Sequence, residues 1–228
     1  MSMLFLLIKK RIRRKINTWK VRNKQKVFCI GRNKTGTTSL KQAFIDLGYI
    51  VGEQDIAEHL FDDYFLTGNY QPIINYCKTA QVFQDMPFSF YQTLPHIDKA
   101  FPNSKFILTV RDSPDQWYTS FVKYYSKSVG VNGRPAKYEE LESSNYVSSN
   151  YRTKFIVDAH GTSAEDPFNR NILIKEYSKH IDYVESHFKG REKSLLTLNI
   201  AEPSAFQRFL DFIGQKSNAI EFPWENKT

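Results

Sequence analysis

An apolar segment runs directly into a loop of glycine, lysine and hydroxyl side chains at residues 27–39, which read Val-Phe-Cys-Ile-Gly-Arg-Asn-Lys-Thr-Gly-Thr-Thr-Ser. Apolar residues then recur at helical spacing from Leu40 to Leu47, and Gly48 follows as a helix stop. This pattern predicts a strand, a short loop and a helix that begins in the loop. Because unpaired N–H groups and the positive end of the helix dipole favour an anion there, we expect the fold to present a phosphate-binding turn.

The loop offers several groups to such an anion. Lys34 supplies a positive charge, and hydroxyl groups surround it at Thr35, Thr37, Thr38 and Ser39. In the usual nucleoside-triphosphate signature the lysine directly follows the second glycine, and the next hydroxyl binds magnesium. Here Lys34 lies two residues before Gly36, which argues against that class. A plain strand-to-helix turn with ordinary capping residues is the structural alternative.

A second strand-to-helix junction follows later in the chain. Residues 105–110 are strongly apolar and predict a strand that ends at Arg111. Ser113 can cap a following helix, with Pro114 in its first turn and Gln116 at the position that completes a capping box. Arg111 is therefore expected at the carboxyl end of a strand, where open α/β sheets bind their ligands.

These junctions resemble those of the sulfotransferases that use 3′-phosphoadenosine 5′-phosphosulfate (PAPS), and the resemblance extends over about residues 26–228. Residues 31–38 are similar to the family's 5′-phosphosulfate loop. The resemblance implies PAPS as co-substrate without a required metal, and it implies that the phosphosulfate is bound by Lys34, Thr35, Gly36, Thr37, Thr38 and Ser39.

The second junction is similar to the family element that binds the 3′-phosphate of PAPS. The resemblance implies that Arg111 and Ser120 make this contact. The interval between them is one residue longer than the commoner family spacing, which would place Thr119 in the role. We favour Ser120, because it follows Trp117 as the serine of many relatives follows a helix tryptophan. A surface serine is the structural alternative for Ser120.

A carboxylate ends the short β-rich run at residues 80–85. Pro87 follows closely, so the strand is expected to stop there with Asp85 pointing outward. Sulfotransferases commonly carry the catalytic base at this position, which implies that Asp85 removes the proton of the acceptor hydroxyl. An aspartate with the ordinary pKa of about 3.9 is a weak base and would need burial or a nearby anion. The alternative is that Asp85 caps a helix that begins near Ser89.

Strand and helix patterns alternate along the chain. This order predicts an α/β protein in which helices cover both faces of a central parallel sheet, and the resemblance implies the three-layer P-loop-like fold of the family. Strands are expected near residues 26–31, 81–85, 105–110 and 194–199. We expect a single domain over residues 27–228 after a tail of residues 1–26. A polar segment near residues 130–165 is expected to form a lid or an acceptor-facing insertion.

The formal charge of +8 comes from the tail, because residues 1–26 contain ten of the 32 basic residues and none of the 24 acidic ones. The first eight residues are largely apolar, and a basic cluster follows at 9–15. This run is too short to span a bilayer, and its order is opposite to that of a secretory signal. It predicts a peripheral contact with an anionic membrane at the cytoplasmic face. A disordered basic arm is the alternative, and no specific nucleic-acid partner is expected.

Cysteine and histidine usage points to a reducing compartment and to no metal site. Cys29 and Cys77 fall in apolar segments with no spacing for disulfides or a metal. The five histidines are scattered and do not form a ligand set. Glu53 and Gln54 follow a further predicted strand, where they either face the acceptor or belong to a polar loop.

Taken with the residues, the resemblance implies a PAPS-dependent sulfotransferase that acts on a hydroxyl group, or less favourably an amine, of a carbohydrate or small molecule. In the expected in-line displacement, Asp85 deprotonates the acceptor and Lys34 neutralises charge on the leaving nucleotide. A kinase or nucleotidase of P-loop architecture is the competing enzyme class. A non-catalytic, membrane-tethered nucleotide-binding protein is the third reading. The sequence does not identify the acceptor.

Overall fold

The computed structural model describes residues 3–223, with only the backbone described for residues 3, 4, 6 and 7. Its strands are β1 (Val27–Cys29), β2 (Val82–Phe83), β3 (Lys105–Thr109) and β4 (Leu195–Leu198). Its α-helices are α1 (Met3–Val21), α2 (Thr37–Asp46), α3 (Gln54–Leu60), α4 (Gln71–Tyr76), α5 (Leu94–Ala100), α6 (Pro114–Lys127), α7 (Tyr138–Glu142), α8 (Tyr151–Thr153), α9 (Arg170–His187) and α10 (Ala205–Ile213). Three single helical turns join them, the π-helical turns Phe61–Phe65 and Lys154–Asp158 and the 3₁₀ turn Glu192–Ser194.

The four strands form one sheet in the order β2-β1-β3-β4, and every pair is parallel. Val27 of β1 lies opposite Val82 on one side and Lys105 on the other. Val51 adds a parallel bridge to Val82 at the outer edge of β2. Helices return the chain between the strands, as parallel pairing requires. The predicted parallel sheet is confirmed, and all four expected strand positions are occupied.

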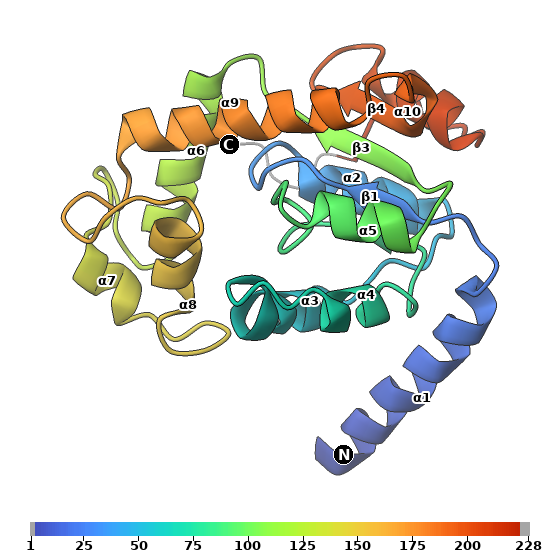
Figure 1. Ribbon diagram of the computed structural model, residues 1–228, viewed down its shortest axis with the longest axis horizontal. Helices are drawn as coiled ribbons and strands as arrows, with labels where there is room; N and C mark the ends of the chain where they lie inside the picture. Colours follow the sequence, from blue (N-terminus) through green and yellow to red (C-terminus); the bar gives the residue numbers. More distant parts are fainter. Residues whose placement is uncertain (1–2, 224–228) are drawn as a thin grey trace.

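One face of the sheet carries an aromatic row. Phe28 stacks against Phe83 at 5.6 Å and against Phe106 at 5.4 Å between ring centroids. The three rings come from adjacent strands and point to the same side, because Phe28 lies opposite Phe83 and Phe106 in the register of the sheet. This face packs against α3, α4, α5, α6 and α9, which form one helical layer (Figure 1).

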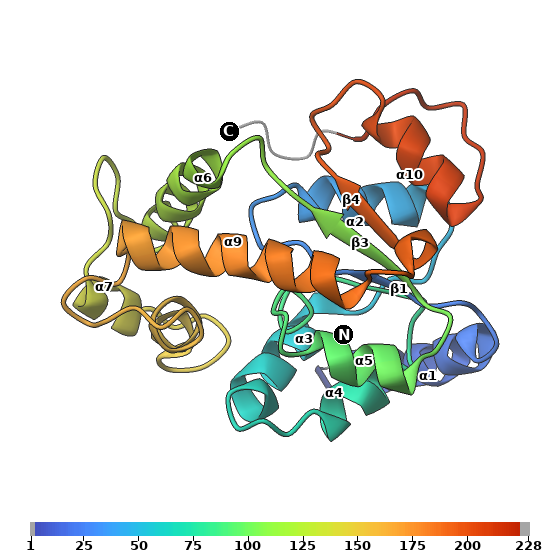
Figure 2. The ribbon, with the colours of Figure 1, turned by 45° about the horizontal axis from the view of Figure 1, so that its top comes forward.

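The opposite face carries the intervening strand residues. Val27 and Cys29 of β1 point there, together with Ile107 of β3, and they pack against α2 and α10. Figure 2 shows these two helices together on their side of the sheet. The molecule therefore has the three layers that the sequence predicted. Because both faces are buried, the strands read as continuous apolar runs.

The segment predicted as a lid or insertion, residues 130–165, folds into α7, α8 and a π-helical turn. It packs beside α6, where Ala136 N–H donates to Ser126 Oγ (2.9 Å). Phe155 of its π-helical turn contacts Phe61 of the other π-helical turn at 5.9 Å between ring centroids. This segment forms one wall next to the carboxyl ends of the strands. Its action as a lid stays a prediction.

The N-terminal helix α1 projects from the rest of the molecule (Figure 1). Its last residue, Val21, is buried, and ion pairs connect its middle to the start of α3. Within residues 3–223, no helix combines the length and the apolarity that a bilayer crossing needs.

Candidate functional site

The loop between β1 and α2 turns through two residues in the left-handed region, Lys34 (φ 73°) and Gly36 (φ 97°). A Cβ atom at Gly36 would lie 2.1 Å from Ile200 Cδ1, so another residue would have to displace Ile200 and adopt a left-handed backbone. No side chain caps the first turn of α2, which begins at Thr37. The backbone donors of that turn are thus available to a bound anion, as the sequence predicted.

Two threonines hold this loop against β3. Thr35 Oγ1 donates to the carbonyl of Arg32 (2.6 Å) and lies 2.5 Å from Thr109 Oγ1. Gly31 permits the approach, because a Cβ atom there would lie 2.0 Å from Thr109 Oγ1. The Thr35 hydroxyl therefore faces the interior of the protein. Of the predicted phosphosulfate residues, Thr35 is the one that does not line the adjoining cavity.

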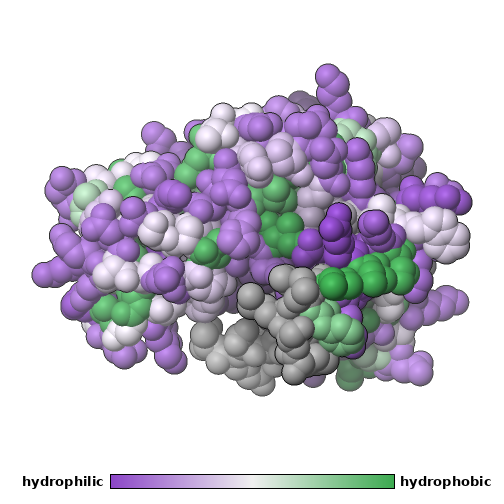
Figure 3. Space-filling model, turned by 90° about the horizontal axis from the view of Figure 1, so that it is seen from below, coloured by the Kyte–Doolittle hydropathy of each residue, from purple (hydrophilic) through white to green (hydrophobic). Residues whose placement is uncertain are grey.

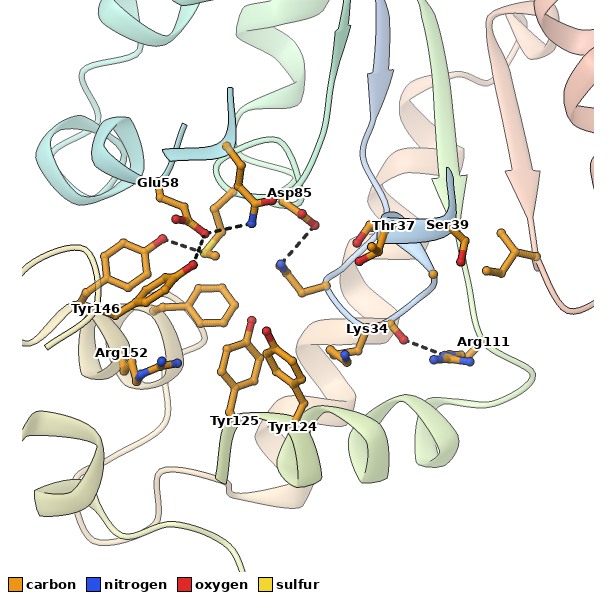
Figure 4. Close-up of a pocket in the computed structure, with 18 residues that line it drawn as sticks. Lys34, Thr37, Ser39, Glu58, Asp85, Arg111, Tyr124, Tyr125, Tyr146 and Arg152 are labelled. Atoms are coloured by element: carbon orange, nitrogen blue, oxygen red, sulfur yellow. Dashed lines mark hydrogen bonds between the residues drawn. The ribbon is translucent and has the colours of Figure 1, made fainter. Parts of the chain in front are cut away.

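A cavity of about 520 Å³ opens in front of the loop, and Figure 4 shows its lining. We call it the loop cavity. One end holds the loop and the second predicted junction, with Lys34, Gly36, Thr37, Thr38, Ser39 and Arg111. The other end is formed by helices and insertion residues, with Gln54, Glu58, Tyr125, Tyr146, Tyr151, Arg152 and Phe155. Tyr124 lies at the loop end, where the centre of its ring is 3.8 Å from Lys34 Nζ. Asp85 lies between the two ends.

The two predicted junctions are joined directly. Arg111 Nε donates to the carbonyl of Lys34 (2.7 Å), and Trp117 Nε1 donates to the carbonyl of Asn33 (2.9 Å). The backbone N–H of Arg111 donates to the hydroxyl of Tyr177 (3.0 Å). Burial and the nearby Arg111 lower the pKa of Lys34. Two cations thus lie side by side, an arrangement that an anion would stabilise.

A second space of about 940 Å³, which we call the side cleft, adjoins the loop cavity and shares Lys34 and Arg111 with it. Both Thr119 and Ser120 line it. The Thr119 hydroxyl donates to the carbonyl of Asp115 (2.9 Å), within its own helix. The Ser120 hydroxyl is buried and has no hydrogen-bond partner among the described residues. A buried hydroxyl without a partner costs free energy. The Ser120 hydroxyl therefore remains available to a ligand, whereas the Thr119 hydroxyl is already bonded within its helix.

The start of α6 follows the predicted capping pattern in part. Gln116 N–H donates to Ser113 Oγ (3.1 Å). The Gln116 side chain accepts from the N–H of Asp112 (3.0 Å) instead of that of Ser113, so the reciprocal half of the capping box is displaced by one residue. The cap fixes α6 directly after Arg111.

Asp85 is buried beside the loop, with a left-handed backbone (φ 56°). Its carboxylate accepts from Gln84 Nε2 (3.1 Å) and Asn33 Nδ2 (3.3 Å). Burial raises its pKa, and a hydrogen bond from Thr37 and the charge of Lys41 oppose that rise. A raised pKa makes the ionised carboxylate a stronger base than an ordinary aspartate.

The helix-capping alternative for Asp85 does not match this geometry. Ser89 N–H donates to the backbone carbonyl of Asp85 (2.9 Å), and the next helix, α5, begins only at Leu94. The side chain of Asp85 instead lines the loop cavity.

Beside Gln54, the far end of the cavity contains three residues that the sequence analysis did not identify, Glu58, Tyr146 and Arg152. Tyr146 Oη and Gln54 Nε2 donate to Glu58 Oε1 at 3.1 and 3.0 Å. Burial and Glu58 raise the pKa of Tyr146 to about 12. The Arg152 guanidinium lies 4.8 Å from the centre of the Tyr146 ring, and its buried Nε has no hydrogen-bond partner among the described residues. These residues come from short helices and loops, and no sequence motif marks them.

The two polar residues after the edge strand separate. Gln54 lines the loop cavity, whereas Glu53 faces the other way and pairs with Arg14 of α1 (3.1 Å). A contact of Gln54 with the acceptor therefore stays a prediction, whereas Glu53 does not line the cavity.

Two histidines are buried, one behind the loop and one in the 130–165 segment. His180 Nε2 donates to the carbonyl of Ile30 (2.7 Å), and His160 Nδ1 donates to the carbonyl of Phe155 (2.8 Å). Burial, with a smaller effect of Arg32, lowers the pKa of both and brings that of His160 to about 3, so both rings are neutral. In the described part of the chain, no group of three or more His, Cys, Asp or Glu side chains is placed to hold a metal ion.

A family model described as a sulfotransferase domain matches residues 26–228. The match begins directly before β1 and includes both strand-to-helix junctions and Asp85. No curated protein matches the chain.

Proposed function

The chain belongs to the sulfotransferase family, a family of PAPS-dependent transferases, and we propose that it transfers the sulfuryl group to a hydroxyl group of a carbohydrate or a small molecule. An amine is the less favoured acceptor. The observation that carries this proposal is the joining of the two junctions, in which Arg111 Nε donates to the carbonyl of Lys34 at the start of the loop cavity. A ligand with phosphate groups at both ends of a ribose fits two adjacent cations in two connected spaces.

The residues present fit PAPS. For the 5′-phosphosulfate we propose Lys34, the uncapped first turn of α2 and the side chains of Thr37, Thr38 and Ser39. For the 3′-phosphate we propose Arg111 and Ser120, because the buried Ser120 hydroxyl has no partner of its own among the described residues. Thr35 takes the role of a support for the loop, since its hydroxyl is bonded to Arg32 and lies against Thr109.

We propose that Asp85 acts as the general base. It takes the proton of the acceptor hydroxyl, whose oxygen then forms the new bond to sulfur while the bond from sulfur to the phosphate oxygen breaks. Lys34 stabilises the charge that develops on that leaving oxygen. Its lowered pKa favours sharing of its proton in this step. The position of Asp85 between the two ends of the cavity supports this division of roles.

The far end of the cavity supports a hydroxylated acceptor. Aromatic rings of Tyr125 and Tyr146 offer flat apolar surfaces, and Glu58 and Arg152 offer an acceptor and a set of donors. Such a mixture of ring faces with few polar groups is suited to a sugar or another compact polyol. We therefore propose that Glu58 and Arg152 orient the acceptor.

For location we propose the cytoplasm, with the basic N-terminal segment in peripheral contact with the membrane. Cys29 and Cys77 are buried free thiols, which supports a reducing compartment.

The test is a turnover assay on the purified protein. Mass spectrometry follows the formation of 3′-phosphoadenosine 5′-phosphate (PAP) and of a sulfated product from PAPS across a panel of sugars, phenols and amines. A parallel arm supplies ATP and magnesium. We expect a sulfated hydroxyl product with PAPS and no phosphorylated product with ATP. Phosphorylation alone would replace the proposal with the kinase reading.

A further inference from the structure

Helix α1 has an apolar stripe along one side. Phe5, Ile8, Ile12, Ile16 and Trp19 follow one another at intervals of three or four residues, so they share a face of the helix. Each is between 45% and 66% exposed. Of the eleven large hydrophobic side chains that are exposed in the described part of the chain, these five belong to this one helix.

The opposite side of α1 is fixed to the body. Lys10 pairs with Asp55 (3.3 Å) and Arg14 pairs with Glu53 (3.1 Å). Ile12 lies two positions from each of these cations, which is about half a helical turn away. The ion pairs therefore hold the helix with its apolar stripe turned away from the protein.

Cations border the stripe. α1 contains no acidic residue. Within residues 3–223, four of its cations have no ion-pair partner, namely Lys9, Arg11, Lys15 and Lys20. Figure 3 looks at the side of the molecule on which α1 lies and shows a hydrophobic strip next to hydrophilic side chains. An apolar face with basic flanks is the pattern of a helix that lies in the interface of an anionic membrane.

We propose that α1 docks the enzyme on an anionic phospholipid surface, with the apolar stripe inserted among the acyl chains and the flanking cations on the lipid phosphates. A second copy of the chain fits this face less well, because pairing two stripes would bring two sets of unpaired cations together. The inference rests on the proposed membrane contact of the N-terminal segment and is independent of the proposed sulfuryl transfer.

The docking helix is connected to the acceptor end of the loop cavity. The partners of α1 are Glu53 and Asp55. Gln54 and Glu58, which lie near them in α3, line the cavity. The ion pairs thus fix the orientation of the cavity relative to the membrane. An acceptor presented at the lipid surface would meet a cavity held in one orientation.

The experiment is co-sedimentation of the full chain with vesicles of phosphatidylcholine and phosphatidylserine, compared with phosphatidylcholine alone. We expect binding to the mixed vesicles only. Ile12→Asp is expected to reduce it about tenfold or more, and Lys15→Gln about fivefold. Ile220→Asp is the matched control, because Ile220 is 88% exposed but lies outside α1. PAP binding of each variant, measured without vesicles, reports that the fold is intact and tests the chemistry separately.

Trp19 provides a second readout. Its fluorescence is expected to shift to shorter wavelength when mixed vesicles are added, and this shift is expected to vanish in Trp19→Phe. Equal binding of the wild type and Ile12→Asp would overturn the proposal, as would binding that does not depend on phosphatidylserine. A dimer in sedimentation analysis that Ile12→Asp dissociates, without vesicle binding, would assign the stripe to a second copy instead.

Discussion

The two ends of the loop cavity are built in different ways. The end with Lys34 and Arg111 lies at the carboxyl ends of β1 and β3, where backbone geometry and two strand-to-helix turns set each position. The end with Glu58 and Arg152 is assembled from short helices, where side chains alone set the surface. The first end constrains the sequence through glycine, lysine and capping residues. Few sequence rules constrain the second end, so its side chains are free to change, and with them the molecule that it binds.

The largest expected effect is at the residue between the ends. Asp85→Asn should lower kcat by about 10²- to 10⁴-fold, because the variant retains the shape and loses the base. PAP binding, measured by calorimetry, should stay within about twofold of the wild type. Loss of PAP binding in parallel would place Asp85 in the cofactor end and contradict the division of the cavity.

The same variant should be more stable than the wild type. Burial raises the pKa of Asp85 above its unfolded value, so the ionised carboxylate costs folding free energy at neutral pH. That cost appears as the pH rises through the interval between the unfolded and folded pKa values. The free energy of unfolding of Asp85→Asn, measured in urea at pH 7, is expected to exceed that of the wild type by about 1 kcal/mol. This difference should vanish at a pH below both the folded and the unfolded pKa.

Backbone geometry at the cofactor end is tested by Gly36→Ala. Its Cβ would collide with Ile200. We expect the free energy of unfolding to fall by about 2 kcal/mol beyond the cost of the left-handed backbone itself. Gly48→Ala is the matched control, since Gly48 has φ 79° and no atom within 4 Å of the added Cβ. Thermal unfolding of the two variants gives the difference. Similar losses at both glycines would mean that Ile200 does not confine the loop.

The side cleft is tested by substituting two adjacent residues of α6, Ser120 and Thr119. Ser120→Ala should weaken PAP binding about tenfold, because a hydrogen bond to a charged phosphate is lost. It should leave ADP binding unchanged, since ADP has no 3′-phosphate. Thr119→Ala should change neither, because its hydroxyl is bonded within α6. A larger effect at Thr119 would reverse the assignment.

A substitution at the acceptor end of the loop cavity should change the binding of the acceptor and leave nucleotide binding unchanged. Arg152→Gln is expected to raise the acceptor KM about fivefold, with PAP binding unchanged, because it removes donors from the far end alone. Steady-state kinetics with the acceptor found in the turnover assay provides the measurement. A matched rise in the KM for PAPS would show that the two ends are not separate.

The smallest effect concerns pH. Lys41 lowers the pKa of Asp85, so Lys41→Met should raise it. The rate falls as the pH falls through this pKa, because the base must be ionised. The acid limb of the pH–rate profile should therefore move to higher pH in the variant. An unchanged acid limb would indicate that another group controls it.

Particular residues show why the sequence predicted one end and missed the other. Gly36 and Lys34 stand at fixed positions in a strand-to-helix turn, and Ser113 marks the start of α6, so local rules placed them. The inward position of the Thr35 hydroxyl could not be read from the sequence, because it depends on Thr109, which is distant in sequence. Glu58 and Arg152 come to line the same cavity only after α3 and the 130–165 segment pack together, and no local pattern encodes that arrangement.

The N-terminal helix shows the same distinction. Its basic composition was visible in the sequence, whereas the direction of the apolar stripe became clear only from the ion pairs of Lys10 and Arg14.

The most direct test of the central claim is calorimetric titration with PAP and with ADP, with metals chelated, for the wild type, Lys34→Ala and Arg111→Ala. The account predicts that the wild type prefers PAP, that Lys34→Ala weakens both nucleotides, and that Arg111→Ala removes the preference for PAP. Equal binding of PAP and ADP by the wild type would contradict the assignment of the 3′-phosphate site and with it the proposed reading of the cavity.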